Sequence, residues 1–160
     1  MITIGVLSDT HLTGPNKFFR EKVLRCFADV DMILHAGDLT NISLLDAFGS
    51  KTVHAVHGNM CGYQAQMDLP AKKIIEVGSF QIGLAHGTGY YQNIEERLYN
   101  DFGPLDCIVY GHTHKAVCHR LGKTLFVNPG SFSAGLSATY AIITAGQKLA
   151  ATIHTVEPIT

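Results

Sequence analysis

Short apolar runs alternate with amphipathic segments in the first third of the chain. Strands are expected at residues 1–7, 31–35 and 52–56, which are rich in Ile, Val, Leu and Met. Residues 17–30 carry apolar side chains at near-helical spacing. Thr40 or Asn41 can cap a second, short helix that ends at Gly49. This β-α-β-α-β order predicts parallel strands joined by right-handed crossovers.

The remaining chain has a different pattern. Residues 60–70 are expected to form an irregular surface loop, residues 93–100 a short helix and residues 107–110 a buried strand. Three hairpins are expected, each with a glycine-containing turn: residues 72–77 with 80–85, 116–120 with 124–128, and 140–144 with 149–156. The C-terminal half is therefore predicted to be mostly antiparallel. The chain has 160 residues, of which 46% are hydrophobic, so a single α/β domain over residues 1–160 is expected.

Polar side chains follow five of the predicted strands. Asp9 and His11 follow the first, and the others are followed by Asp38, Asn59, His86, and the pair His112 and His114. Ligands of parallel sheets gather at the carboxyl ends of the strands, so these side chains are expected to converge. In an extended backbone, residues two apart point the same way. His112 and His114 are thus expected to face one point, or two points a few ångströms apart.

This set of donors favours a transition-metal site. It contains two carboxylates, four imidazoles and one amide, which is enough for two ions if one carboxylate bridges them. The set has no thiolate, which disfavours iron–sulfur chemistry, and its imidazoles disfavour calcium. Mn²⁺, Fe²⁺, Ni²⁺, Co²⁺ and Zn²⁺ all suit these donors.

Composition narrows the possible partners and compartment. The net charge is −1 and no basic block occurs, which argues against a dedicated nucleic-acid surface or an anionic membrane surface. No signal peptide and no membrane-spanning stretch is expected. The four cysteines have irregular spacing, so the reducing cytoplasm is the expected compartment, with Cys26 and Cys107 as small core residues. A homo-oligomer remains open.

The order of these motifs resembles the calcineurin-like metallophosphoesterases, in particular their small bacterial and archaeal phosphodiesterases. The resemblance runs from Ser8-Asp9-Thr10-His11 through Gly37-Asp38, Gly58-Asn59 and His86-Gly87 to Gly111-His112-Thr113-His114, and includes Asn128-Pro129-Gly130-Ser131. It implies a four-layer sandwich: two stacked mixed β-sheets flanked by helices.

The resemblance also implies roles for the residues of the site. Asp9, His11 and His114 bind one divalent ion, Asn59, His86 and His112 bind the other, and Asp38 bridges the two. Asn59, His86 and His112 also count as catalytic residues. The expected cofactor is two transition-metal ions, with manganese first and iron, nickel, cobalt or zinc as alternatives.

The implied activity is a phosphodiesterase for small phosphate esters, in which a metal-bound hydroxide attacks phosphorus. The alternative is a non-catalytic protein-binding scaffold on the same fold, since a retromer subunit shares it. Seven convergent ligands favour the enzyme.

The general acid is left open by a departure from the family pattern. Many relatives carry His after the Gly-Asn pair, whereas this chain has Met60 and Cys61, and a thioether has no proton to donate. His35, His57 and Cys61 are alternative acids. The other histidines, His54, His119 and His154, are expected at the surface or in the core, and Tyr90 and Tyr91 either line the pocket or pack in the loop.

Overall fold

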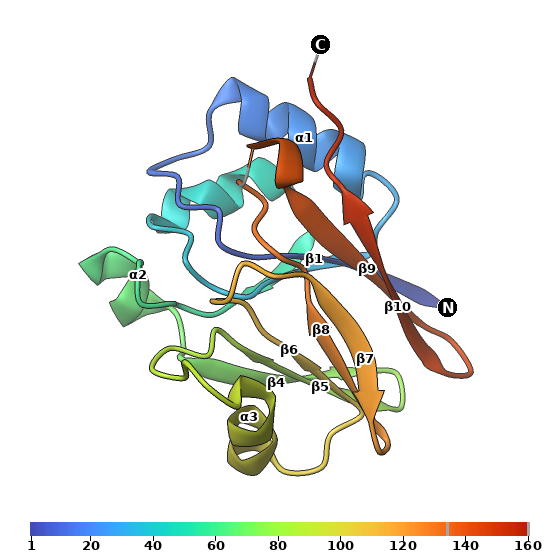
Figure 1. Cartoon of the computed structure of the whole chain (residues 1–160). Helices are drawn as coiled ribbons and strands as arrows, with labels where there is room; N and C mark the ends of the chain where they lie inside the picture. Colours follow the sequence, from blue (N-terminus) through green and yellow to red (C-terminus); the bar gives the residue numbers. More distant parts are fainter. Residues whose placement is uncertain (134, 160) are drawn as a thin grey trace.

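Two five-stranded sheets face each other and helices cover their outer sides (Figure 1). They belong to a computed structural model that describes residues 1–133 and 135–159. The strand orders are β10-β9-β1-β2-β3 and β4-β5-β6-β8-β7. The predicted α/β class and stacked mixed sheets are confirmed.

The bounds of the elements follow the hydrophobic pattern closely. The first sheet contains β1 (Ile2–Leu7), β2 (Met32–His35), β3 (Thr52–Ala55), β9 (Thr139–Ala145) and β10 (Leu149–Thr155). The second contains β4 (Lys72–Val77), β5 (Phe80–Ala85), β6 (Cys107–Val109), β7 (Val117–Leu121) and β8 (Thr124–Asn128). The helices are α1 (Lys17–Phe27), α2 (Tyr63–Asp68), α3 (Ile94–Phe102) and the 3₁₀ helices η1 (Ile42–Phe48) and η2 (Gly135–Ser137). No helix in the described ranges is long and apolar enough to span a bilayer.

The central strands are buried on both faces, so their side chains alternate between two apolar layers. In β6, Cys107 and Val109 pack between the sheets, whereas Ile108 packs toward α3. Val127 and Phe126 in β8 divide in the same way. Continuous apolar runs are typical of strands covered on both sides. Cys107 is a core residue as predicted, while Cys26 is only partly buried at the margin of the α1 layer.

The three predicted hairpins are present, but the expectation of a mostly antiparallel C-terminal half is only partly correct. β6 runs parallel to both of its neighbours, β5 and β8. The β9–β10 hairpin returns to the first sheet, where β9 pairs antiparallel with β1. Local turn signals identify hairpins, whereas pairing between distant strands depends on how the whole chain is connected.

The segment expected to be an irregular loop, residues 60–70, contains a helix. α2 has only six residues and buries only Ala65. Its N-cap is Gly62, which makes no side-chain cap hydrogen bond. A helix this short has neither the apolar stripe nor the cap signal that sequence patterning detects.

Candidate metal centre

Loops from both sheets meet at one edge of the molecule and are tied together by their backbones. The N–H groups of Asp9 and His11 donate to the carbonyl oxygens of Gly37 and Asp38, both at 3.0 Å. The Gly111 N–H donates to the His86 carbonyl at 3.3 Å. These bonds place the ends of β1 and β2 together, and those of β5 and β6.

Five of the predicted ligands have left-handed backbones. The φ angles are 53° at Asp9, 48° at His11, 57° at Asp38, 68° at His112 and 57° at His114. This corrects the expectation that His112 and His114 align through an extended backbone. The left-handed region is uncommon for non-glycine residues, and such conformations concentrate at functional sites.

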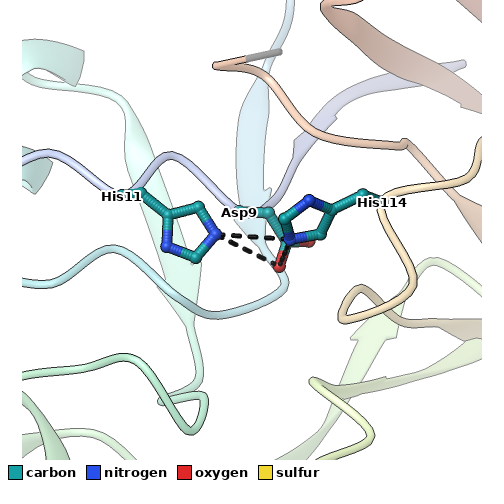
Figure 2. Close-up of side chains that lie close together, drawn as sticks. All are labelled: Asp9, His11 and His114. Carbon is teal, nitrogen blue, oxygen red and sulfur yellow. Dashed lines mark hydrogen bonds and ion pairs between the residues drawn. The ribbon is translucent and has the colours of Figure 1, made fainter. Parts of the chain in front are cut away.

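The first group of donors contains Asp9, His11 and His114 (Figure 2). The two imidazole rings approach from opposite sides, with 3.3 Å between their Nε2 atoms. Asp9 Oδ1 lies 3.2 Å from His114 Nε2 and 3.9 Å from His11 Nε2. Three donor atoms are therefore close enough to share one ion.

The second group contains Asp9, Asp38 and His86. His86 Nε2 lies 3.2 Å from Asp38 Oδ2 and 3.8 Å from Asp9 Oδ1. The same nitrogen lies 3.2 Å from Asn59 Oδ1. Asp38 Oδ2 also lies 3.9 Å from His11 Nε2, so this carboxylate faces both groups. Asp9 belongs to both groups as well.

His112 stands at the margin of the second group. Its ring centroid lies 5.1 Å from that of His86, and its backbone N–H donates to Asp9 Oδ2 at 3.2 Å. His112 and His114 therefore face two different points, with His114 directed to Asp9 Oδ1 and His112 packed on His86. All seven predicted side chains lie in one cluster, and His112 enters it through its ring and its backbone.

Asp9 Oδ1 gives a direct test of whether this cluster suits a cation. Asp9 is fully buried, and Oδ1 is the only buried side-chain oxygen or nitrogen in the described ranges without a hydrogen bond. Leaving a buried carboxylate oxygen unpaired is costly. Since this oxygen faces imidazole nitrogens from three histidines, a shared divalent cation would satisfy it. The donor set and its geometry fit a metal.

The protonation of the cluster responds to its carboxylates. Burial raises the pKa of Asp38, but the hydrogen bond and charge of His86 outweigh burial and hold this pKa below its ordinary value. Burial lowers the pKa of His86, but Asp38 and Asp9 together raise it above its ordinary value. The pKa of His112 is lowered by burial and then by the charge of His86. A metal ion would thus compete with a proton at His86.

His86 is held by a hydrogen bond on the far side of its ring. Nδ1 lies 2.8 Å from the carbonyl oxygen of Ala36, which assigns the ring proton of the neutral form to Nδ1. The lone pair of Nε2 then points into the cluster. Such an outer hydrogen bond is typical of metal-binding histidines.

Two glycines allow the loops to approach this closely. A Cβ at Gly58 would overlap Asp38 Oδ1, and a Cβ at Gly111 would overlap Ser8 Oγ. Steric hindrance therefore explains why glycine precedes Asn59 and His112.

The alternative acids differ in their position. His35 is fully buried, and its Nδ1 accepts the Gly37 N–H at 3.2 Å, so His35 is sealed from substrate. Cys61 is buried and its sulfur accepts the Gly58 N–H at 3.2 Å, which gives it a role in the loop. His57 lines a cavity of about 220 Å³ together with His86. It is the one of the three that shares a cavity with the cluster.

Several supporting residues were missed by sequence reasoning. Ser8 Oγ donates to Asp9 Oδ2 at 2.6 Å, and Ser131 Oγ donates to the Asp9 carbonyl at 2.9 Å. Asn128 Nδ2 donates to the Gly111 carbonyl at 2.9 Å. The only signal for Ser131 and Asn128 was that their Asn-Pro-Gly-Ser motif belongs to the family resemblance, which assigned them no role.

The model of the calcineurin-like phosphoesterase superfamily domain matches residues 2–148. The chain belongs to this family. A probable metallophosphoesterase of Methanothermobacter thermautotrophicus is 36% identical over 132 residues, which cover 80% of this chain and 76% of the relative. A phosphodiesterase of Methanocaldococcus jannaschii is 28% identical over 142 residues, which cover 79% of this chain and 82% of the relative.

The phosphoesterase fold is also seen in the crystal structure of Vps29 from Chaetomium thermophilum. The TM-score is 0.76, the identity is 17%, and the match covers 98% of this chain and 97% of Vps29. At this identity the similarity concerns the fold. The family uses divalent metals, and the cluster supplies candidate ligands for them.

Proposed function

We propose that this chain is a dinuclear metal-dependent phosphodiesterase acting on small phosphate esters. The observation that carries the proposal is the unsatisfied, buried Asp9 Oδ1 facing three imidazoles within 3.9 Å. Membership of the phosphoesterase family and the relative that is named a phosphodiesterase support the reaction class.

Asp38 is proposed as the bridge between the two ions. Asp9, His11 and His114 would hold one ion, and Asn59, His86 and His112 would hold the other. The position of Asp38 Oδ2, 3.2 Å from His86 Nε2 and 3.9 Å from His11 Nε2, supports this role. The placement of Asp9 in both groups favours a second, central role for its Oδ1. Manganese is proposed as the first ion to test among the transition metals that suit nitrogen and oxygen donors.

When bound, two divalent ions would supply positive charge for the phosphate and would lower the pKa of a water molecule. The protein holds the donors in place before substrate arrives. His86 is fixed by Ala36, and the Asp9 carboxylate by Ser8 Oγ and the His112 N–H. Preorganised groups of this kind need no rearrangement during the reaction.

Asp38→Asn tests the proposal. Purified protein is expected to hold close to two transition-metal ions per chain, because two donor groups share the carboxylates. The variant is expected to lose most of the occupancy of one of the two ions and most of its activity, since an amide bridges two cations poorly. Metal analysis and an activated aryl diester assay measure both effects. Asp46→Asn, at an exposed position in η1, is the matched control. Full occupancy and activity in Asp38→Asn would remove Asp38 from the bridge.

A protein-binding scaffold is the second candidate because Vps29 has the same fold. A scaffold predicts that metal-loaded protein hydrolyses neither aryl nor alkyl diesters. Turnover that is abolished by chelation and restored by added Mn²⁺ would support the enzyme instead.

A further inference from the structure

Tyr91 is a large aromatic side chain that lies almost fully in solvent beside the candidate metal centre. It is 88% exposed, and its ring centroid lies 5.7 Å from that of His112. The two rings are inclined by 59°. The His112 ring contacts both the Tyr91 ring and the His86 ring, so it lies between them. An exposed Tyr elsewhere on the surface would need no explanation, but one at this position borders the place where substrate would bind.

The neighbouring Tyr90 shows that the loop itself is anchored without Tyr91. The Tyr90 hydroxyl donates to the Asp101 carboxylate, and the Arg97 guanidinium lies 5.4 Å from the Tyr90 ring centre. The Tyr90 backbone N–H donates to the Gly87 carbonyl at 3.0 Å. Because Tyr90 supplies these contacts, the Tyr91 ring is left accessible on a loop that is held in place.

A second exposed apolar residue, Met60, contacts Asp38 through its backbone. Met60 is 57% exposed, and its backbone N–H donates to Asp38 Oδ1 at 2.7 Å. The loop after β5 thus places the Tyr91 ring beside the cluster, and the loop after β3 carries an exposed apolar residue whose backbone contacts Asp38. Such surroundings favour a substrate with a flat apolar group over one with further charges. Aromatic rings stack on tyrosine, and thioethers contact ring edges favourably.

We propose that Tyr91 is a specificity-determining residue that stacks on an aromatic ring carried by the substrate. The inference rests on the proposed phosphodiesterase function and assigns its substrate class: phosphate esters with an aryl group or a nucleobase. Both share a flat ring at a short distance from phosphorus, and stacking on such rings tolerates different ring types.

Binding of ligands that lack a phosphodiester bond tests the stacking separately from diester hydrolysis. Two matched pairs are titrated calorimetrically into the manganese-loaded protein: phenylphosphonate against methylphosphonate, and adenosine 5′-monophosphate against ribose 5-phosphate. Within each pair the phosphoryl group is kept and the ring is removed. Tyr91→Ala is expected to weaken the ring-bearing ligand about tenfold, the scale of one stacking contact, with the ring-free ligand unchanged. The pair that responds identifies an aryl or a nucleoside substrate.

Three variants serve as controls. Tyr91→Phe keeps the ring and is expected to bind within about twofold of wild type, because stacking does not need the hydroxyl. Tyr91→Leu keeps apolar area without a ring and is expected to resemble Tyr91→Ala. Tyr99→Ala removes an exposed tyrosine from α3, where it lines a different cavity, and is expected to change nothing.

The outcomes separate this inference from the proposed function. Equal weakening of both members of a pair would overturn stacking and show that Tyr91 acts through His112. Wild-type protein that binds the ring-free and ring-bearing ligands equally would also overturn it, while the phosphoryl site would stand. Failure of the manganese-loaded wild type to bind any of the four ligands would overturn the proposed function and the stacking with it.

Discussion

His35 is the histidine closest in sequence to Asp38 that the cluster does not use. Because its Nδ1 accepts the Gly37 N–H, its proton lies on Nε2, 3.1 Å from Thr10 Oγ1. Thr10 Oγ1 in turn donates to the Asp38 carbonyl at 3.4 Å. His35 thereby links the loops that follow β1 and β2, and it does so as a neutral ring. Burial, followed by the charge of His86, lowers the pKa of His35 to about 3.

This depressed pKa predicts acid sensitivity. The unfolded chain takes up a proton at His35 near pH 6.5, whereas the folded chain does so only near pH 3. Between these values the unfolded state binds more protons, so His35 makes the free energy of unfolding fall as the pH falls. The slope is about 1.4 kcal/mol per pH unit for one proton. Above pH 6.5 His35 adds no pH dependence.

The contribution of His35 to the pH dependence of the free energy of unfolding is measured by urea unfolding. Wild type and His35→Gln are compared at several pH values with chelator present. The variant is expected to be less stable at pH 7 but to lose less stability between pH 6.5 and pH 3. His86 is present in both proteins, so the difference between the curves reports the removal of His35. Parallel curves for the two proteins would show that His35 is not the acid-sensitive group.

The Met60 side chain has no proton to donate to a leaving group. For this reason an alkyl leaving group must depart without general acid catalysis from this position. Such catalysis typically raises the rate about 10² to 10⁴-fold. Wild type is therefore expected to prefer activated aryl diesters, with kcat/KM steeply dependent on leaving-group pKa. Met60→His is expected to flatten that dependence.

The measurement is kcat/KM for a series of diesters in both proteins at matched metal content. Equally shallow slopes would mean that wild type already has an acid, and His57, which shares a cavity with His86, is the first residue to test. Equally steep slopes would mean that an imidazole at position 60 does not reach the leaving oxygen. Tyr91→Ala should lower kcat/KM for the diesters that carry an aromatic ring and leave that of ring-free diesters unchanged.

At the scale of elements, α1 shows how a helix holds the first sheet. The Asn16 side chain caps this helix, because its Oδ1 accepts a hydrogen bond from the Phe19 N–H at 2.8 Å. Phe27 is fully buried, stacked on Phe132 at 5.7 Å, and meets the Tyr140 ring edge-on at 5.3 Å. The helix therefore binds segments from the C-terminal part of the chain as well as β1.

Phe27→Ala is expected to lower the free energy of unfolding by about 3–5 kcal/mol, because it removes a ring from a packed layer. Leu24→Ala on the same helix is the matched control. Leu24 is 67% exposed, so its loss is expected to cost within about 0.5 kcal/mol. Urea unfolding monitored by circular dichroism compares them. A similar, small loss in both variants would show that α1 contributes little to the packing of this layer.

At the scale of the molecule, the candidate centre joins the two sheets. Asp9, Asp38 and Asn59 follow strands of the first sheet, whereas His86 and His114 follow strands of the second. An ion bound by both sets links the halves of the sandwich. Since such an ion binds the folded state, it stabilises that state by mass action, by about 2.7 kcal/mol at one hundred times its Kd.

Removal of metal is therefore expected to lower the melting temperature of wild type. Thermal unfolding before and after chelation measures the change, and readdition of Mn²⁺ should reverse it. Asp38→Asn is expected to respond less, because it is expected to hold fewer ions. An unchanged melting temperature in wild type, with metal loss verified by elemental analysis, would mean that the ions do not link the sheets.

Much of the fold could be predicted because its signals are local. Apolar runs with glycine turns identified the three hairpins, and helical spacing identified α1 and α3 within a few residues. The short helix α2 and the parallel pairing of β6 were not predicted. Neither leaves a local pattern: α2 buries one residue, and β6 pairs with strands far away in the sequence.

The sequence by itself determined which donors end the strands, since Asp9, Asp38, His86 and His112 each follow an apolar run. Only the tertiary structure decided how these donors face one another. It gave their residues left-handed backbones, made Asp9 Oδ1 central to both groups, and buried His35 away from substrate. The physical reason is that chemical identity and hydrophobic period are properties of neighbouring residues, whereas burial and side-chain direction arise when two sheets pack and bring distant loops to one edge.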